Sequence, residues 1–597
     1  MKRFTKKLIK STTVFLAASS CLLLSNCKGK TTSTTSTIIE DTGTSKTVVS
    51  VPTIDVKNSD FKSANITFFH GIDEEDKTTS TTKAYFKKVD DGICYVSIDE
   101  MMKNVSKAIE ADDFFSTEIQ NKKITTSFKH FNGETEYITL DTSTNIVKIS
   151  SANYYTYLGD DEKVETTITS KIESNSFNRK EMSFDLDDYN LTSYYVDNTV
   201  LLPLSLFELI YTQELGYYFY YFNGSIYGDF NGINDYSGKI KDVVCSKEVR
   251  ELTYNYLRLL FHKYYGLAQY KGLDTIEKVD EYLKDYKKDI LSTNSRDYEQ
   301  AESDIFNMLL DDPHSGYINR SIYSKGEDIE ILDGAKNTLI SDTIDVNTDI
   351  KAKNEVEEED MLWYLGDDGF NHYCGFVVGN TAFIDFDEFN LNFDKTTGAE
   401  PSFIDDGDVF SIMYYAIKCI RDLNCSSQVI KNIVLDLSLN TGGYVNAAYE
   451  CLSFMTNDPI IHNYEYAGTK QYGSTKVLVD NDLDGDFTDN DAAVEFNWFI
   501  QTSVVSFSCG NLVPFIAKDY GFATIIGQTS GGGMCVVGGG VLPDGSFFQK
   551  SDVLMRNVSR AEMNGQTYRS CEEGVLPDIQ LENLYDYKKT VELINKK

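Results

Sequence analysis

Hydrophobic positions follow three different patterns along the 597-residue chain. From 51 to 240, apolar and polar residues alternate in short runs such as "NITFFHG", "GICYVSI" and "TEYITL", separated by turn residues. Alternation of this kind, with many Thr, Tyr, Ile and Val residues, predicts β-strands. We therefore expect a β-rich, stalk-like N-terminal domain at 51–240, interrupted by short helices at "SIDEMMKNVSKAIE" and "LLPLSLFELIY".

The pattern changes twice after residue 240. From 241 to 325, apolar residues recur every three or four positions, as in "SKEVRELTYNYLRLLFHKYYGLA", which predicts a helical subdomain. From 326 to 597, buried strands such as "IKNIVLDLSL" alternate with amphipathic helices such as "DVFSIMYYAIKCIRDL". This alternation predicts an α/β domain whose mostly parallel sheet is flanked by helices, and active sites of such sheets lie at the carboxyl ends of the strands.

The N-terminus has the pattern of an export signal. "MKRFTKKLIK" is basic, and the following "STTVFLAASSCLLLSN" is a short apolar run that ends in small residues. "LSNC" is similar to a bacterial lipobox and predicts a signal peptide at 1–27 with lipidation at Cys27, while Cys21 after "ASS" is a poorer candidate. Plain secretion and a retained helix are the alternatives. The polar Ser/Thr-rich stretch 28–50 then forms a tether.

Composition narrows the classes of partner. The chain is 41% hydrophobic and 13% aromatic, which suits globular packing, and its formal net charge is −36. Binding to nucleic acid depends on Lys and Arg that neutralise phosphates, so this acidity argues against it and fits a solvated extracellular surface. The 11 cysteines show no CxxC pair or zinc-finger spacing, and most are expected to be small buried residues.

Candidate chemistry begins with "VSFSCGN" at 505–511. Ser508 is predicted to end a strand and begin a helix, which brings its oxygen close to free backbone N–H groups. Gly510 allows a tight turn at this point. The alternative is that Ser508 is only the N-cap of the helix, since Asn511 follows three residues later.

Other segments favour a nucleophile. "IVLDLSLNTGG" (433–443) is a buried strand that ends in two glycines, whose N–H groups could approach a substrate as an oxyanion hole requires. Together with "LLDDPHSGYI" (309–318), "KDYGFATIIGQTSGGG" (518–533) and "CEEGVLPDI" (571–579), it resembles the tail-specific, or C-terminal-processing, serine peptidases over roughly 241–580. The resemblance implies Ser508 as nucleophile and an oxyanion hole formed by Gly442, Gly443 and Cys509.

The base expected from this family is missing. Gly532 stands where the family has the Lys of its T-x-G-K-G loop. A serine nucleophile needs a base within hydrogen-bond reach. His314 in "DDPHSGY" resembles the base of the tricorn-type branch, with Glu572, or alternatively Glu573, as the third member. A packing role for His314 at the end of a helix is the alternative. No clear PDZ module precedes "TAFIDF".

A second candidate site is the acidic stretch "DNDLDGDFTDND" at 480–491. Its oxygen-bearing residues follow the spacing of an EF-hand loop, although the last is Asp instead of Glu and no clear helices flank it. The expected Ca²⁺ ligands are Asp480, Asp482, Asp484, Asp486, Thr488 and Asp491. A solvated acidic turn is the alternative.

The sequence thus predicts a lipoprotein of the bacterial cell surface that acts as a serine endopeptidase. Catalysis is expected to need no cofactor, the Ca²⁺ would be structural, and the partners are a peptide or protein substrate and, through the lipid anchor, the membrane. Two alternatives remain open: a catalytically inactive peptidase fold that binds peptides or cell-wall glycans, and an adhesin or cell-wall spacer whose main function lies in 51–240.

Overall fold

The chain forms two compact units in a computed structural model. Unit 1 comprises segments 1–158, 181–333 and 537–552, and unit 2 comprises 159–180, 334–536 and 553–597. The predicted consecutive domains 51–240, 241–325 and 326–597 differ from these units, which are discontinuous in sequence. The structure describes residues 52–71, 78–108, 114–130, 133–156, 165–167, 170–229, 235–240, 242–354, 356–365, 371–391, 407–426 and 429–596.

The N-terminal predictions fall outside this part of the chain. The signal segment 1–27 with Cys27, and the tether 28–50, lie outside the described residues. Among the residues that are described, no helix is long and apolar enough to span a bilayer.

Unit 1 contains most of the predicted β-rich region, except segment 159–180, which belongs to unit 2. Its larger sheet has the order β12-β13-β4-β3-β2-β15-β14, with β1 paired to β2, and its smaller sheet has the order β11-β8-β7-β6-β5. The larger sheet consists of β1 (Ile54–Asp55), β2 (Phe61–His70), β3 (Thr78–Lys87), β4 (Tyr95–Ser97), β12 (Tyr194–Val196), β13 (Thr199–Pro203), β14 (Tyr218–Phe222) and β15 (Ser225–Asp229). The smaller sheet consists of β5 (Ser116–Gln120), β6 (Lys123–Lys129), β7 (Thr135–Asp141), β8 (Ile146–Ile149) and β11 (Met182–Asp185).

The predicted helical region also lies in unit 1. It contains α4 (Lys247–Lys263), α5 (Ile276–Leu283), α6 (Lys287–Ile290), α7 (Ser295–Ser303) and the π-helix η5 (Asp304–Leu309), while α2 (Ile98–Ala108) and α3 (Leu204–Phe207) are the short helices predicted earlier. Arg250 of α4 forms fully buried ion pairs with Glu302 of α7, at 2.7 Å, and with Asp544, at 2.9 Å. These paired charges attach segment 537–552 to unit 1, because leaving one partner buried alone would be strongly destabilising.

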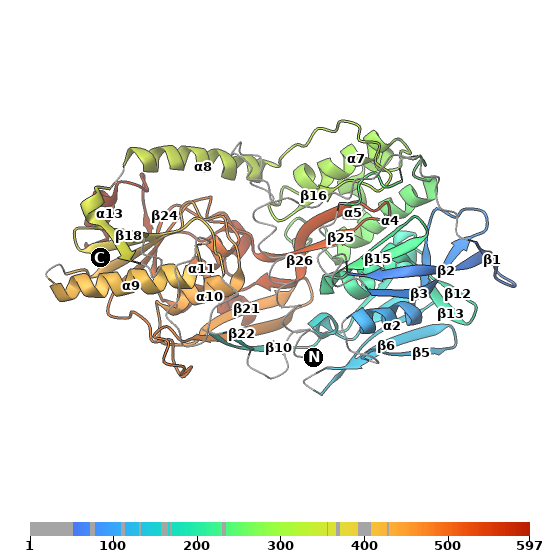
Figure 1. Cartoon of the computed structure of the whole chain (residues 1–597), viewed down its shortest axis with the longest axis horizontal. Helices are drawn as coiled ribbons and strands as arrows, with labels where there is room; N and C mark the ends of the chain where they lie inside the picture. The colour runs from blue at the N-terminus through green and yellow to red at the C-terminus, as the bar shows by residue number, and fades with distance from the viewer. Residues whose placement is uncertain are drawn as a thin grey trace. The chain divides into compact units, whose positions relative to one another are not determined.

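Unit 2 is built on the predicted mostly parallel sheet (Figure 1). The strand order is β17-β18-β19-β20-β23-β24-β27, and the pairs from β19 to β27 are parallel. The strands are β17 (Met361–Leu365), β18 (Asn371–Val378), β19 (Thr381–Asp385), β20 (Asn432–Asp436), β23 (Asn497–Thr502), β24 (Thr524–Gly527) and β27 (Ile579–Gln580). All of β20 is buried, which explains its continuous apolar run "NIVLD".

Helices pack against this sheet. Helix α13 (Tyr587–Ile594) packs on the face that carries Phe383, Val434 and Phe499, which are paired in register on adjacent strands. The remaining helices of unit 2 are α8 (Ala335–Lys353), α9 (Val409–Ser426), α10 (Val445–Ser453), α11 (Cys509–Tyr520) and α12 (Arg560–Met563). The predicted α/β class with a mostly parallel sheet is confirmed.

A second ladder in unit 2 is antiparallel. Strand β10 (Ser170–Phe177) pairs along its whole length with β22 (Gln471–Val479), with β9 (Glu165–Thr167) on one side and β21 (Ile460–Tyr466) beyond β22. Strand β21 also pairs with the last residues of β26 (Phe547–Asn557), whose first residues pair with β16 (Gly316–Asn319). Strand β25 (Cys535–Val541) also pairs with β26.

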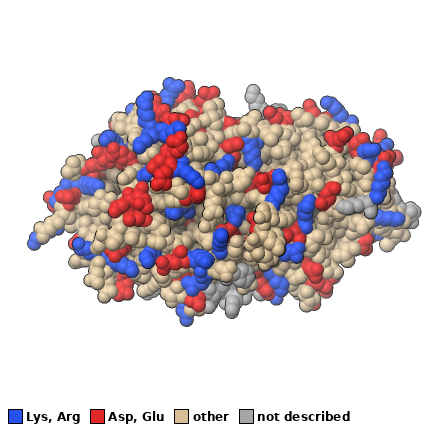
Figure 2. All heavy atoms as spheres, turned by 180° about the vertical axis from the view of Figure 1, so that it is seen from behind, with Lys and Arg blue, Asp and Glu red and all other residues tan. Residues whose placement is uncertain are grey.

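Charged side chains are distributed without segregation by sign. Figure 2 shows Lys and Arg intermixed with Asp and Glu over the face that it presents. This face shows no continuous basic surface.

Candidate active site

Three loops meet at the carboxyl ends of β20, β23 and β24, where ligands bind in sheets of this type. The prediction that a strand ends at Ser508 is wrong, because β23 ends at Thr502, before "SVVSFS". The hydroxyls beyond it are bonded to the neighbouring loop: Ser503 Oγ donates to Ser438 O at 2.6 Å and Ser506 Oγ donates to Leu437 O at 2.7 Å. These bonds turn the chain out of the sheet just before Ser508.

Ser508 has an uncommon backbone conformation. Its φ of 54° and ψ of −120° are those of the first central residue of a type II′ turn, where glycine is usual. Ser508 stands at the N-cap position of α11, yet its side chain makes no capping hydrogen bond. Ser246 and Ser559, by contrast, do cap their helices with their hydroxyls. The capping interpretation of Ser508 is therefore not supported, and its backbone holds strain of a kind that clusters at functional sites.

Glycines leave the space that this turn needs. A Cβ added to Gly442 would lie 2.7 Å from Ser508 Cβ, and one added to Gly533 would lie 2.9 Å from Ser508 N. A Cβ at Gly510 would lie 2.6 Å from the Asn440 carbonyl oxygen. Segments 440–443 and 531–533 thus approach Ser508 more closely than any residue with a side chain could.

The proposed oxyanion-hole donors differ in their availability. Gly442 N–H donates to Asn440 Oδ1 at 3.0 Å, so it is already engaged. Within the described part of the chain, the N–H groups of Gly443 and Cys509 donate to no backbone or side-chain acceptor. Cys509 Sγ–H donates to Gly443 O at 3.1 Å, which fixes the peptide of Gly443 beside Ser508. The geometry favours Gly443 and Cys509 as the two donors.

The neighbouring thiol does not compete as a nucleophile. Cys509 is buried, and burial raises the pKa of its thiol to about 12. The reactive form of cysteine is the thiolate, so Cys509 remains an unreactive thiol at neutral pH.

Glu572 lies beside the glycine loop that contacts Ser508. Its Oε2 accepts hydrogen bonds from the N–H groups of Gly533, at 3.1 Å, and Met534, at 3.0 Å. Ser508 N–H in turn donates to Gly532 O at 3.0 Å. The alternative residue, Glu573, is exposed and its carboxylate belongs to the capping box of Ser570. The structure therefore places Glu572, and not Glu573, next to the site.

Position 532 has no room for a lysine. Gly532 has φ +84°, and a Cβ added there would lie 2.1 Å from the Glu572 carbonyl oxygen. The residue that departs from the pattern of the resembled family is thus required by the local packing of this chain.

His314 lies in unit 1, whereas Ser508 lies in unit 2, and their pairing stays a prediction. The backbone N–H of His314 donates to Asp312 Oδ1 at 3.1 Å, and Asp312 Oδ2 accepts from Ser315 Oγ and Tyr265 Oη. Burial alone would raise the pKa of Asp312, but the His314 ring and these hydrogen bonds lower it below its usual range. Asp312 therefore presents a negative charge near the His314 ring.

Another histidine can be assigned a structural role. His462 in unit 2 is buried, with Nδ1 at 2.6 Å from Tyr449 Oη and Nε2 at 2.7 Å from Asn557 Oδ1. Burial lowers the pKa of this imidazole to about 4, partly opposed by the Asn557 hydrogen bond. With both ring nitrogens engaged, His462 is a core residue rather than a base.

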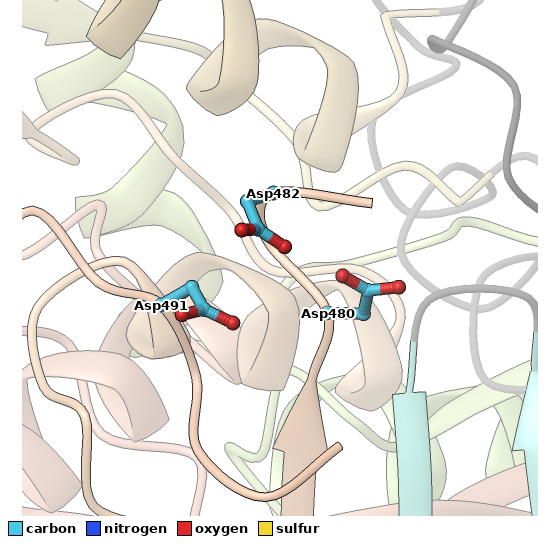
Figure 3. A group of neighbouring side chains, drawn as sticks. All are labelled: Asp480, Asp482 and Asp491. Atoms are coloured by element: carbon cyan, nitrogen blue, oxygen red, sulfur yellow. The ribbon is translucent and has the colours of Figure 1, made fainter. Parts of the chain in front are cut away.

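The acidic loop brings part of the predicted Ca²⁺ set together (Figure 3). Carboxylate oxygens of Asp480, Asp482 and Asp491 lie within 4.8 Å of one another. Asp484 contributes its backbone N–H to Asp480 and Asp482, and its own carboxylate lies outside this cluster, as does that of Asp486. Burial and the neighbouring carboxylates raise the pKa of Asp491 to about 6. Such mutual repulsion would be relieved by a divalent cation, whose preferred ligands are carboxylate oxygens.

Two residues of the site were missed from the sequence. Asn440 belongs to the Asn-Thr-Gly-Gly segment. Its Oδ1 accepts a hydrogen bond from Gly442 N–H, and its Nδ2 donates one to Phe386 O. Lys336, at the start of α8, pairs with Glu572 Oε1 at 2.6 Å. Asn440 could have been found from its motif, whereas no local pattern singles out Lys336.

Comparison with known proteins finds a match in the C-terminal part of the chain. Residues 412–581 match the model of peptidase family S41. Among curated proteins, no sequence matches the chain.

Similar solved structures include a photosystem II D1 C-terminal processing protease (15% identity, TM-score 0.25), mature CPAF complexed with lactacystin (11%, 0.34) and a lipoprotein from Streptococcus agalactiae (13%, 0.30). The similarities cover 38%, 59% and 59% of this chain and 49%, 97% and 96% of those chains. The chain thus spans about half the length of the first of them. The match to the family model is confined to residues 412–581.

Proposed function

We propose that this chain is a serine-type peptidase that hydrolyses peptide bonds through an acyl-enzyme formed on Ser508. The support for this class is the match of residues 412–581 to the model of peptidase family S41. In this proposal Ser508 Oγ attacks the scissile carbonyl carbon while its proton passes to the His314 ring. The N–H groups of Gly443 and Cys509 stabilise the oxyanion. Collapse of the intermediate breaks the C–N bond and returns the proton to the leaving amine, and water then releases the acyl group.

The observation that carries this proposal is the conformation of Ser508. A serine with φ 54° and ψ −120° is strained, and its hydroxyl makes no capping hydrogen bond to α11 although it stands at the N-cap position. A residue that served only to cap the helix would have no reason to adopt this conformation. The family match at 412–581 includes Ser508 and both proposed oxyanion donors.

His314 is the proposed base because neutral imidazole accepts protons near neutral pH. The support is its place in the "DDPHSGY" segment, the negative charge of Asp312 beside it, and the structural role found for His462. Glu572 is the proposed third member, and its contacts with Gly533 and Met534 indicate that it acts through the loop that holds Ser508.

We also propose that the protein acts at the bacterial cell surface on peptide or protein substrates, anchored by a lipid at Cys27. The support is the lipobox "LSNC" and the tether 28–50, together with the acidic charge of −36. Replacing Cys27 by Ser should release the protein from membranes of cells that express it. Membrane retention of this variant would contradict the anchor.

For the acidic loop we propose a structural Ca²⁺ site. Its support is the EF-hand order of residues 480–491 and the cluster of Asp480, Asp482 and Asp491 (Figure 3). Ca²⁺ at millimolar concentration should raise the melting temperature, and EGTA should reverse this. Asp491→Asn should abolish the response, whereas Asp422→Asn on α9 should leave it intact. An unchanged melting temperature with Ca²⁺ would contradict the proposal.

The test of catalysis is hydrolysis of a denatured protein substrate by the full chain. Wild type should cleave it, Ser508→Ala should reduce the rate to background, and His314→Gln should lower it by about 10⁶-fold. Circular dichroism should show that each variant is folded. Binding of peptides by wild-type protein without cleavage would favour the alternative of an inactive peptidase fold.

A further inference from the structure

We propose that Lys336 is a positioning residue of this site: through its ion pair with Glu572 it holds the glycine loop 531–534 against Ser508. This inference rests on the proposed function for its effect on catalysis. Its structural part concerns only contacts within unit 2. Lys336 follows the first residue of α8 (Figure 1), a helix outside the segment that matches the family.

The first link is the pair itself. Lys336 Nζ lies 2.6 Å from Glu572 Oε1, and the two side chains are 21% and 4% exposed. The other carboxylate oxygen of Glu572 accepts two backbone N–H groups, from Gly533 and Met534. Nearly the whole carboxylate is thus removed from water, and leaving a buried carboxylate without its charged partner is strongly destabilising.

The second link joins the loop to Ser508. Phe507 and Gly532 form a parallel bridge, Ser508 N–H donates to Gly532 O at 3.0 Å, and Gly531 N–H donates to Ser506 O at 2.8 Å. The glycine loop is therefore bonded to residues 506–508 on one side and to Glu572 on the other. Movement of Glu572 would be transmitted to the backbone of Ser508.

The third link is the docking of α8 on the same segment. Ile340, one turn after Lys336, packs against Val505 and Phe507, and Ile344 joins the same apolar cluster. Lys336 Nζ also lies 5.1 Å from the centre of the Phe507 ring, within the range of a cation–π interaction. Positions 336, 340 and 344 share one helix face, so α8 contributes both the charge and the apolar contacts that hold residues 505–507.

Lys336 is proposed to position the loop in its charged form and not to act as a base. Its ammonium group is shared between the Glu572 carboxylate and the Phe507 ring, and both contacts require the charged form. A base must instead be able to lose its charge and accept the Ser508 proton. Arginine keeps the positive charge but cannot act as a base, because it stays protonated in proteins. Lys336→Arg therefore separates the two roles.

The experiment measures two properties of the full chain: the rate at which a fluorophosphonate labels Ser508, and hydrogen exchange at the amides of Gly533 and Met534. Lys336→Met should accelerate this exchange and slow labelling, each by about tenfold or more. Lys336→Arg should restore both to within about threefold of wild type. Lys353→Met, at the exposed end of the same helix, is the matched control and should change neither. If Lys336→Met does not fold, Lys336→Gln replaces it in both measurements.

A double-mutant cycle with Glu572→Gln tests whether Lys336 acts through Glu572. Adding Lys336→Met to Glu572→Gln should slow labelling by less than about twofold, because the charge it compensates is already gone. Loss of labelling in Lys336→Arg, with unchanged exchange at 533 and 534, would overturn the proposal and favour Lys336 as a base. If wild type is not labelled, catalysis by Ser508 fails separately. Hydrogen exchange at the amides of Gly533 and Met534 is then the remaining test of the role of Lys336. Unchanged exchange in Lys336→Met overturns the inference, and accelerated exchange supports it.

Discussion

At the scale of single residues, the site depends on positions where a side chain is either strained or impossible. Ser508 has φ 54°, a conformation in which glycine would be unstrained. At Gly442, Gly532 and Gly533 a Cβ would collide with neighbouring atoms, so glycine allows the two loops to pack closely at this site. The close contacts that these glycines allow hold Ser508 in its strained conformation. Without them, its backbone would relax to another conformation.

This strain has a measurable consequence for stability. Ser508→Gly should have a free energy of unfolding about 1 kcal/mol higher than Ser508→Ala, since glycine adopts φ 54°, ψ −120° without a Cβ penalty. Urea denaturation of the two inactive variants provides the comparison, and both lack the hydroxyl. Equal stability, or a less stable glycine variant, would show that Ser508 is not strained.

Position 532 allows a second residue-scale prediction. Gly532→Lys, which restores the residue expected from the resembled family, should destabilise the protein by about 1–3 kcal/mol and reduce labelling of Ser508. The reason is that its Cβ would lie 2.1 Å from the Glu572 carbonyl oxygen and its φ is +84°. Thermal unfolding and fluorophosphonate labelling give the two readouts, and a stable, more active variant would contradict the geometry described here.

At the scale of elements, local periodicity predicted many helices and strands of unit 2. It failed where long-range hydrogen bonds and ion pairs determine the local structure. The apolar run of β20 and the amphipathic pattern of α9 were sufficient to predict them. The Ser- and Val-containing stretch "TSVVSFS" (502–508) favoured a strand that ends at Ser508, whereas β23 ends at Thr502. Local propensity does not register the hydroxyl hydrogen bonds from Ser503 and Ser506 to the neighbouring loop. Lys336 was missed for the same reason, as its partner lies 236 residues away.

His462 connects three elements and makes their stability depend on pH. On β21 it bridges Tyr449 of α10 and Asn557 at the end of β26. Its pKa is lowered from the ordinary value of 6.5 to about 4, so between these values the unfolded chain binds a proton that the folded chain does not. Its contribution to the free energy of unfolding is therefore fully present above pH 6.5 and falls by about 3 kcal/mol as the pH drops to 4.

The variant His462→Gln isolates this contribution. It keeps hydrogen-bonding atoms at the site but cannot titrate, so its stability should fall less than that of wild type between pH 7 and pH 4.5. Urea denaturation at both pH values, compared between the two proteins, removes the contribution of all other groups. The same pH dependence in both proteins would contradict the assignment of His462 as a buried neutral imidazole.

At the scale of the whole molecule, chain order does not correspond to the compact units. Strand β10 comes from the region predicted as a stalk and pairs with β22 in unit 2, while segment 537–552 returns to unit 1 through the ion pair of Asp544 with Arg250. The composition and periodicity of each segment were sufficient to predict strands and helices. Pairing between strands about 300 residues apart depends on long-range contacts that no local pattern encodes.

Mass spectrometry after reaction with a fluorophosphonate tests whether Ser508 is the nucleophile of a serine-type peptidase. We expect one adduct per folded chain, on the peptide that contains Ser508, and none on Ser508→Ala or on denatured wild type. An adduct on any other residue, or no adduct on the folded wild-type protein, would contradict this role of Ser508.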